Sequence, residues 1–220
     1  MFSKSLRPLT DLVRRILSKP DERGDLTSDL FRLKIRDKIR QIIKNSRGLL
    51  LDIGCGKGLL YETLLTKQNM FKVVGVDTDF EMLKTANESF QNKKYGLNFL
   101  KAHAQDLPFL DESIDIAICI NTFYNFHTKD DVITALEEMK RVCKRDGFII
   151  FDVRNKINPL VYLSFKFVWL YDTQVTLNAY SLKELTTALT SRGFVIKETI
   201  PIGFPITMFA PIILVKAGYR

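Results

Sequence analysis

The segment from Leu49 to Leu60, LLLDIGCGKGLL, constrains the fold more than any other part of the chain. A short apolar run typical of a buried strand ends in Asp52, and glycines follow at the alternate positions 54, 56 and 58. A leucine-rich helical pattern begins directly afterwards. Because glycine lacks a Cβ, the chain can turn sharply there and its backbone can lie against a ligand. Strand, glycine turn and helix together predict the opening of a nucleotide-binding α/β unit.

Composition is that of a globular protein rather than a membrane-spanning or disulfide-linked one. The 220 residues are 46% hydrophobic, which is enough for one α/β domain with additions. No apolar stretch approaches the roughly 20 residues that a membrane-spanning helix needs. The first residues lack the apolar core and cleavage site of a secretory signal. The three cysteines have no metal-binding spacing. We therefore expect a cytoplasmic protein with reduced thiols and no metal.

The net charge of +8 is concentrated at the amino terminus. Residues 1–47 hold 13 Lys and Arg against 6 Asp and Glu, whereas residues 48–220 hold 20 against 19. One interpretation is a solvated helix face. The other is attraction to an anionic partner, namely a phospholipid surface, a nucleic acid or a phosphorylated substrate.

The chain divides into residues 1–47, a basic helical extension or lid, and residues 48–220, an α/β domain. The extension has two amphipathic patterns, at 1–19 and 28–46. From residue 48, strand and helix patterns alternate, which favours a mostly parallel sheet covered on both faces. Ligands bind such sheets beyond the carboxyl ends of the strands. The predicted strands are Leu49–Ile53, Val73–Asp77, Leu97–Ala102, Ile114–Ile120 and Gly147–Val153, and the predicted helices are Gly58–Lys67, Phe80–Gln91 and Asp130–Lys144.

After Val153 the pattern changes. Residues 155–178 are aromatic, with Trp169 and Tyr171 among them, and we expect an insertion over the strand ends. A helix is then predicted from Ser181 to Gly193, capped by the serine and ended by the glycine. Two closing strands are expected at 194–200 and 211–217.

From Leu49 to Ala217 the chain resembles the class I S-adenosylmethionine-dependent methyltransferases, with the pattern of their small-molecule and quinone-type members. Four stretches carry the resemblance, in the same order and spacing: LLLDIGCGKG, VVGVDTDFEML, AHAQDLPFLDESID and EEMKRVCKRDGFIIF. The resemblance implies a Rossmann-like, seven-stranded, mostly parallel sheet with helices on both faces. It also implies S-adenosyl-L-methionine as cofactor and S-adenosyl-L-homocysteine as product.

The family pattern assigns cofactor contacts to particular residues of this chain. Asp77 ends the second strand, where a carboxylate can accept hydrogen bonds from both ribose hydroxyls, although it can also be a helix N-cap. The chain departs from the family at His103, where an Asp usually accepts from the adenine amino group. The predicted cofactor-binding residues are Asp52, Gly54, Cys55, Gly56, Gly58, Asp77, Thr78, Met82, His103, Ala104, Gln105 and Asn121.

Methyl transfer from a sulfonium is an in-line displacement in which positioning of the acceptor dominates catalysis. A general base is needed only where the acceptor atom starts protonated. The predicted catalytic residues are Tyr124 and His127, after the fourth strand. Asp152 with Arg154, after the fifth strand, is a further candidate pair.

We expect a small-molecule or lipid-like acceptor, with the aromatic segment Tyr162–Tyr171 as part of an apolar lid. The basic amino terminus would make the protein peripheral to an anionic membrane surface. One alternative is methylation of RNA or protein, although no RNA-binding module is recognisable. Another is an inactive cofactor-binding partner subunit. An NAD-dependent oxidoreductase is disfavoured, because the spacing is G-x-G-x-G and not G-x-G-x-x-G.

Overall fold

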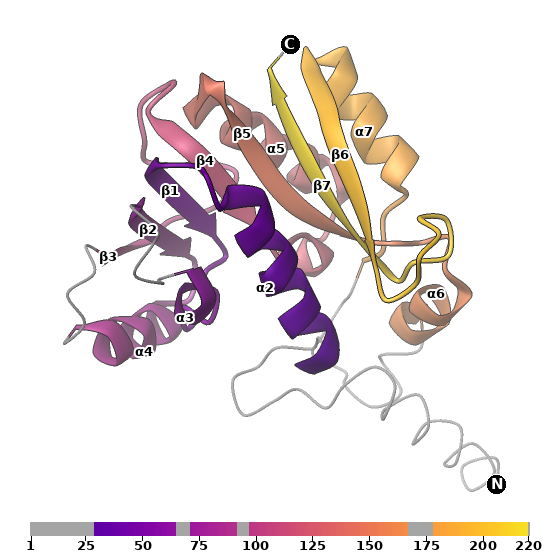
Figure 1. Cartoon of the computed structure of the whole chain (residues 1–220), viewed down its shortest axis with the longest axis horizontal. Helices are drawn as coiled ribbons and strands as arrows, with labels where there is room; N and C mark the ends of the chain where they lie inside the picture. Colours follow the sequence, from indigo (N-terminus) through magenta and orange to yellow (C-terminus); the bar gives the residue numbers. More distant parts are fainter. Residues whose placement is uncertain (1–28, 65–70, 92–96, 167–177, 220) are drawn as a thin grey trace, which may run out of the picture.

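One seven-stranded sheet forms the centre of the molecule (Figure 1). The computed structural model describes residues 29–64, 71–91, 97–166 and 178–219. The strands are β1 (Gly48–Ile53), β2 (Phe71–Asp77), β3 (Leu97–Lys101), β4 (Ile114–Cys119), β5 (Cys143–Arg154), β6 (Phe194–Ile202) and β7 (Ile212–Tyr219). The helices are α2 (Asp29–Ile43), α3 (Tyr61–Leu64), α4 (Phe80–Phe90), the 3-10 turn η1 (Phe123–Asn125), α5 (Lys129–Val142), α6 (Pro159–Lys166) and α7 (Leu182–Ser191).

The strand order is β3-β2-β1-β4-β5-β7-β6. Strands β1 to β5 are parallel, and β7 pairs antiparallel with both β5 and β6. The predicted mostly parallel, Rossmann-like sheet is therefore confirmed. The chain leaves β1 toward β2 on one side and returns to β4 on the other, which creates a switch point between β1 and β4 at the carboxyl edge.

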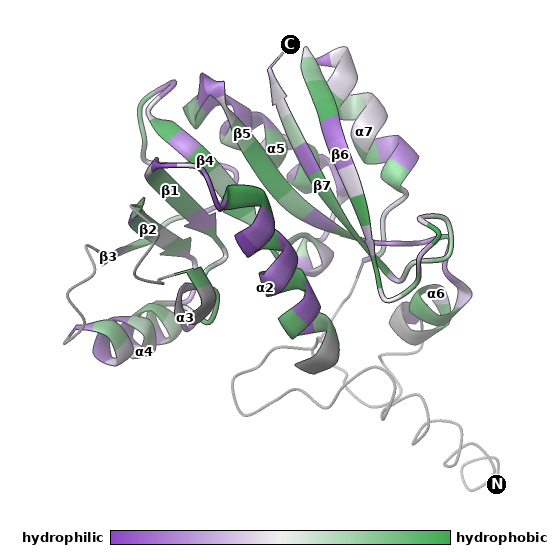
Figure 2. Ribbon diagram, in the orientation of Figure 1, coloured by the Kyte–Doolittle hydropathy of each residue, from purple (hydrophilic) through white to green (hydrophobic). Residues whose placement is uncertain are grey.

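Helices cover both faces of the sheet, and each face has its own apolar core (Figure 2). Residues of α5 and α7 pack on one face, and residues of α2, α3 and α4 pack on the other. Successive side chains of β1 alternate between the two cores, with Leu51 and Ile53 in the first and Leu50 in the second. A strand buried on both faces has to be apolar at nearly every position, which accounts for the run of leucines.

Helix α2 brings the basic extension onto the sheet. Ile35, Ile39 and Ile43 are at most 1% exposed and form a stripe at four-residue spacing. Burial of each such side chain stabilises the fold by about 1.5–3 kcal/mol relative to leaving it in water. Helix α2 therefore packs firmly on the α/β core. The helix predicted at residues 1–19 lies outside the described residues.

Two predicted helix ends were wrong. Helix α5 ends at Val142 and not at Lys144, because Cys143 is extended, buried and paired with Ile114 as the first residue of β5. The helix predicted over Gly58–Lys67 is seen only as α3, which begins after the glycine turn, while residues 65–70 lie outside the description. Periodicity places the middle of a helix better than its ends.

The segment after β5 forms α6 beside the long β6–β7 loop, and residues 167–177 lie outside the description. The predicted aromatic lid is therefore described only as far as Lys166. Ser181 is the N-cap residue of α7, as the sequence predicted, and its amide N–H donates to the Glu184 carboxylate at 3.3 Å. Within the described ranges, no helix combines the length and apolarity that a membrane span requires.

Candidate functional site

A cavity of about 280 Å³ lies at the carboxyl edge of the sheet, around the switch point between β1 and β4. Eight of the predicted site residues line it: Asp52, Gly54, Cys55, Gly56, Asp77, Met82, Asn121 and Tyr124. The other lining residues are Arg32, Ile35, Arg36, Lys57, Leu59, Leu60, Asp79, Ile120 and Asn125. The loops after three strands and one face of α2 thus enclose a single space.

The three glycines after β1 have different reasons to be glycine. At Gly54 an added Cβ would lie 2.1 Å from Thr122 Oγ1, and at Gly58 it would lie 2.9 Å from the Phe90 ring. Gly56 has a φ of +50° and open space where a side chain would be. Among the three, Gly56 is therefore the position where a ligand can lie against bare backbone. This open cradle fits the cofactor that the sequence implies.

Asp77 joins the end of β2 to the glycine turn. Its Oδ2 accepts the Gly56 amide N–H at 2.7 Å, and its Oδ1 accepts the Asp79 amide N–H at 3.0 Å. The N-cap of α4 is instead Asp79, which accepts from the amides of Glu81 and Met82. The alternative that Asp77 is a helix cap is thereby removed. A carboxylate can accept about four hydrogen bonds, so Asp77 retains capacity for ligand hydroxyls.

Asp52 presents a buried carboxyl to the same cavity. The residue is 3% exposed, and burial raises its pKa to about 7, with a smaller contribution from the negative charge of Asp77. Burial favours the neutral carboxylic acid because the charged form loses its hydration. A ligand cation placed beside Asp52 would favour the carboxylate again. The charge of this group therefore responds to what occupies the cavity.

Helix α2 contributes two arginines that sequence reasoning did not assign to the site. Arg32 and Arg36 lie one helical turn apart and line the cavity together with Ile35, and Arg32 is only 9% exposed. The sequence did contain a signal for them. Arg32 and Arg36 are four residues apart on the same side of the predicted helix as the isoleucines, and that side is buried, where a charge exposed to water is not expected. Both have polar or ionic interactions within the protein.

Residues at the end of β5 form hydrogen bonds with the loop that follows β4. Asn121 has a positive φ of 58°, and its amide N–H donates to Asp152 Oδ1 at 2.8 Å. Arg154 donates to Asn121 Oδ1, lies 3.4 Å from Asp152 Oδ2, and places its guanidinium carbon 4.9 Å from the centre of the Tyr124 ring. Asp152 and Arg154 are not among the cavity-lining residues. Their observed role is to orient Asn121 and Tyr124, which do line it.

Six predicted site residues do not line this cavity in the described part of the chain: Gly58, Thr78, His103, Ala104, Gln105 and His127. Thr78, His103 and His127 are exposed, and Ala104 belongs to the apolar core. His127 directly precedes Thr128, the N-cap of α5. The loop with His103 still starts beside the site, because the Ala102 amide donates to the Asp77 carbonyl at 3.1 Å.

Two of the four stretches that resemble the family contact each other and not the cavity. Arg141 of α5 donates to the carbonyls of Leu107 and Phe109 and forms ion pairs with Glu138 and Asp111. Glu138 in turn accepts the Leu107 amide N–H at 2.8 Å. These residues anchor the loop before β4 to α5. These residues of the two stretches therefore stabilise the fold and do not contact a ligand in the cavity.

Comparisons with known proteins agree with this geometry. A family model described as a methyltransferase domain matches residues 51–151. The chain is 29% identical over 156 residues to the ubiquinone/menaquinone biosynthesis C-methyltransferase UbiE of Campylobacter jejuni, covering 68% of this chain and 60% of that protein. It is 36% identical over 104 residues to the uncharacterized methyltransferase YcgJ of Bacillus subtilis, covering 46% and 39%. The chain thus spans about half the length of the curated relatives it matches.

Solved structures extend the similarity to the whole fold. An S-adenosylmethionine-dependent methyltransferase from Clostridium acetobutylicum superimposes with a TM-score of 0.69 at 16% identity, over 97% of this chain and 98% of that one. At that identity the comparison shows the fold alone. The domain match, which begins at Leu51 before the glycine turn and ends in β5, covers the strands that enclose the cavity. Residues 51–151 thus match a methyltransferase domain, and the fold around them is that of solved S-adenosylmethionine-dependent methyltransferases.

Proposed function

We propose that this protein binds S-adenosyl-L-methionine in the cavity and transfers its methyl group to a small-molecule or lipid-like acceptor. The observation that carries the proposal is the pair formed by Gly56 and Asp77. An open backbone cradle and a carboxylate with spare acceptor capacity lie side by side at the switch point of a parallel sheet. Such a site is suited to a ligand with both a ribose and an amino-acid part.

The charges around the cavity suggest how the cofactor is oriented. Asp77 would accept from the ribose hydroxyls, and Met82 would pack against the adenine. Asp52 would face the ammonium of the amino-acid part, while Arg32 and Arg36 would attract its carboxylate. Acidic and basic side chains from different elements of the same cavity would favour one orientation of a zwitterion over the reverse. When bound, this cofactor supplies a sulfonium methyl group to an acceptor atom approaching in line.

The acceptor would bind on the side of the cavity formed by Ile120, Asn121 and Tyr124. Because positioning dominates this chemistry, the rigid support of Asn121 and Tyr124 by Asp152 and Arg154 matters more than a strong base. Where the acceptor starts protonated, the Tyr124 hydroxyl is the predicted group to orient it. His127 is exposed and does not line the cavity, so we assign it no role in the transfer.

Two observations support the proposed class of acceptor: the apolar side chains that line the cavity, and the similarity to a relative. Among the charged and polar residues of the cavity lie four aliphatic side chains, and this apolar surface supports an acceptor with an apolar part: Ile35, Leu59, Leu60 and Ile120. The similarity to a protein named for ubiquinone and menaquinone biosynthesis supports a lipid-like aromatic acceptor. RNA, protein or no acceptor at all are the alternatives that an experiment has to separate.

The decisive experiment measures S-adenosyl-L-homocysteine formed by the full chain with separate sets of acceptors. One set contains quinols, phenols and small amines, and the others contain total RNA and unfolded protein. We expect product only with the first set, and much less of it when Asp77→Ala is used at the same cofactor concentration. Turnover with RNA or protein would contradict the acceptor class. Tight cofactor binding without turnover on any set would instead support an inactive partner subunit.

A further inference from the structure

Exposed apolar side chains gather on two segments that the proposed function does not use. Twelve large apolar residues of the described chain are strongly exposed, and eight of them lie either in the turn into α6 and in α6 itself or in the β6–β7 loop. The eight are Ile157, Leu160, Tyr162, Leu163, Phe204, Ile206, Met208 and Phe209. We call these eight residues the apolar face. Such a concentration marks a binding surface more often than chance exposure does.

Two buried asparagines hold the two segments together. Asn155, 1% exposed, donates through Nδ2 to the carbonyls of Met208 and Ala210, both at 2.9 Å. Asn158, 7% exposed, donates to the Phe209 carbonyl at 2.6 Å. Buried side-chain amides that satisfy the backbone of an apolar loop fix its shape. The apolar face, which is called the platform below, is therefore held in a fixed shape by hydrogen bonds.

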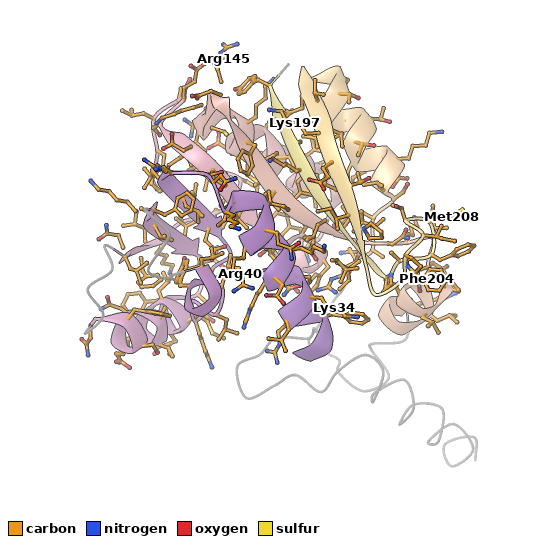
Figure 3. The ribbon with its side chains drawn as sticks, viewed as in Figure 1. Lys34, Arg40, Arg145, Lys197, Phe204 and Met208 are labelled. Atoms are coloured by element: carbon orange, nitrogen blue, oxygen red, sulfur yellow. The ribbon has the colours of Figure 1, made fainter. Side chains whose placement is uncertain are left out.

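The platform lies at the same edge of the sheet as the cavity. Arg154, the last residue of β5, pairs with Ile212, the first residue of β7, so the β6–β7 loop projects beyond the carboxyl ends of the parallel strands. Figure 3 shows Phe204 and Met208 together next to α6, while Arg145 and Lys197 lie toward the opposite edge. A surface that bound the platform would therefore face the edge that contains the cavity.

The charges around the platform are positive. Residues 153–166 contain Arg154, Lys156 and Lys166 and no acidic residue, and residues 199–215 contain no charged residue at all. The ammonium of Lys166 lies 5.8 Å from the centre of the Tyr162 ring. Exposed lysines beside exposed aromatic and aliphatic side chains fit a surface that is anionic outside and apolar beneath.

Helix α2 extends the positive rim. Lys34 and Lys38 line a groove of about 490 Å³ together with Phe204, and Asp37 is the one acidic residue among the lining residues described. Residues 29–47 hold seven of the basic residues of the chain against two acidic ones. Most of the net positive charge of residues 1–47 therefore lies in residues 29–47, which comprise helix α2 and the four residues after it.

We propose that the apolar face, with Lys34, Lys38, Lys156 and Lys166 around it, docks the protein on an anionic phospholipid membrane. The apolar side chains would enter the boundary between headgroups and acyl chains, and the lysines would lie against the phosphates. Docking in this way would bring the edge of the sheet that contains the cavity close to an acceptor dissolved in the membrane. Vesicle binding needs no cofactor, so this proposal and the proposed function fail independently.

The experiment compares sedimentation of the full chain with vesicles of phosphatidylcholine alone and with vesicles that also contain phosphatidylglycerol. We expect binding to the anionic vesicles and roughly tenfold or more weaker binding to the neutral ones, since lysines near the surface are attracted to anionic headgroups. The double variant Phe204→Asp with Met208→Asp should lose roughly tenfold or more in vesicle affinity. Leu110→Asp is the matched control, because Leu110 is 81% exposed and precedes β4 at the other edge.

A second variant, Lys34→Glu with Lys38→Glu, changes only exposed charges and should also weaken binding to anionic vesicles. Wild-type protein that ignores both kinds of vesicle would overturn the proposal. Equal binding by wild type and both double variants would assign the attraction to residues 1–28 and likewise overturn it. A third result would also overturn the proposal: wild-type protein is a dimer that does not bind vesicles, and the double variant Phe204→Asp with Met208→Asp is a monomer. The apolar face would then join two copies of this chain.

Discussion

The carboxylate of Asp77 accepts a hydrogen bond from the backbone amide of Gly56 at 2.7 Å. This contact joins the end of β2 to the turn after β1 across 21 residues of sequence. The acid and the glycine turn are therefore held in place relative to each other by a contact within the protein. Preorganisation of this kind reduces the free energy that ligand binding has to spend on ordering the loop.

Replacing Asp77 by Ala should weaken both S-adenosyl-L-methionine and S-adenosyl-L-homocysteine by about 2–3 kcal/mol, because two hydrogen bonds to a charged acceptor are lost. Titration calorimetry on both ligands checks this. Glu88→Ala, at an exposed position of α4 outside the cavity, is the control and should bind normally. Unchanged affinity in the Asp77 variant would remove the ribose assignment.

The glycines should separate ligand binding from folding. Gly56→Val fills the open cradle and should abolish cofactor binding, while strain at a positive φ costs only about 1–2 kcal/mol of stability. Gly54→Ala instead meets Thr122 and should mainly lower the melting temperature. Calorimetry and thermal unfolding on both variants test the contrast. Normal cofactor binding by Gly56→Val would mean that this glycine only permits the turn.

The pH dependence of both stability and cofactor binding should depend on Asp52. Its pKa is about 7 in the folded protein against an ordinary value of 3.8, so between these pH values the folded state holds a proton that the unfolded state releases. Stability from this group is full below the unfolded pKa and falls as pH rises through the folded pKa. Asp52→Asn should therefore show a flatter dependence of unfolding free energy on pH between those two values.

Cofactor binding should change in the opposite direction. The ammonium of the cofactor favours ionised Asp52, so affinity should rise between about pH 6 and about pH 8 in the wild type. In Asp52→Asn the affinity should be lower and nearly independent of pH over the same range. Calorimetry at several pH values measures this, and parallel curves for the two proteins would show that Asp52 does not contact the ammonium.

Arg154 should affect turnover more than cofactor affinity. Arg154→Met leaves the Asp152 carboxylate buried without its guanidinium and removes a donor to Asn121, so unfolding should become easier by about 3 kcal/mol. Once an acceptor has been identified, kcat of the Arg154→Met variant should be lower than that of the wild type, while the cofactor dissociation constant should change little. Lys183→Met, an exposed change on α7 outside the cavity and the apolar face, is the control. A variant with normal kcat would show that the support of Asn121 and Tyr124 is dispensable.

The sheet, the glycine turn and the acid at the end of the second strand could all be predicted from the amino-acid sequence. Each of these is a local pattern. Leu50 and Leu51 are apolar because β1 is buried on both faces, and Asp77 follows directly on a buried strand. Parallel strands bring their carboxyl ends to one edge whatever the loops contain, so the cavity could be predicted without any knowledge of side-chain contacts.

The set of loop residues that line the cavity could not be predicted in the same way, because it depends on contacts between distant parts of the chain. Asn121 is held by Asp152, which is 31 residues away, and Arg32 and Arg36 enter from a helix that precedes the whole sheet. His103 and His127 stand at suggestive positions in the sequence but are exposed. Periodicity and spacing describe neighbours along the chain, whereas the facing of side chains from separate elements depends on how those elements pack against each other.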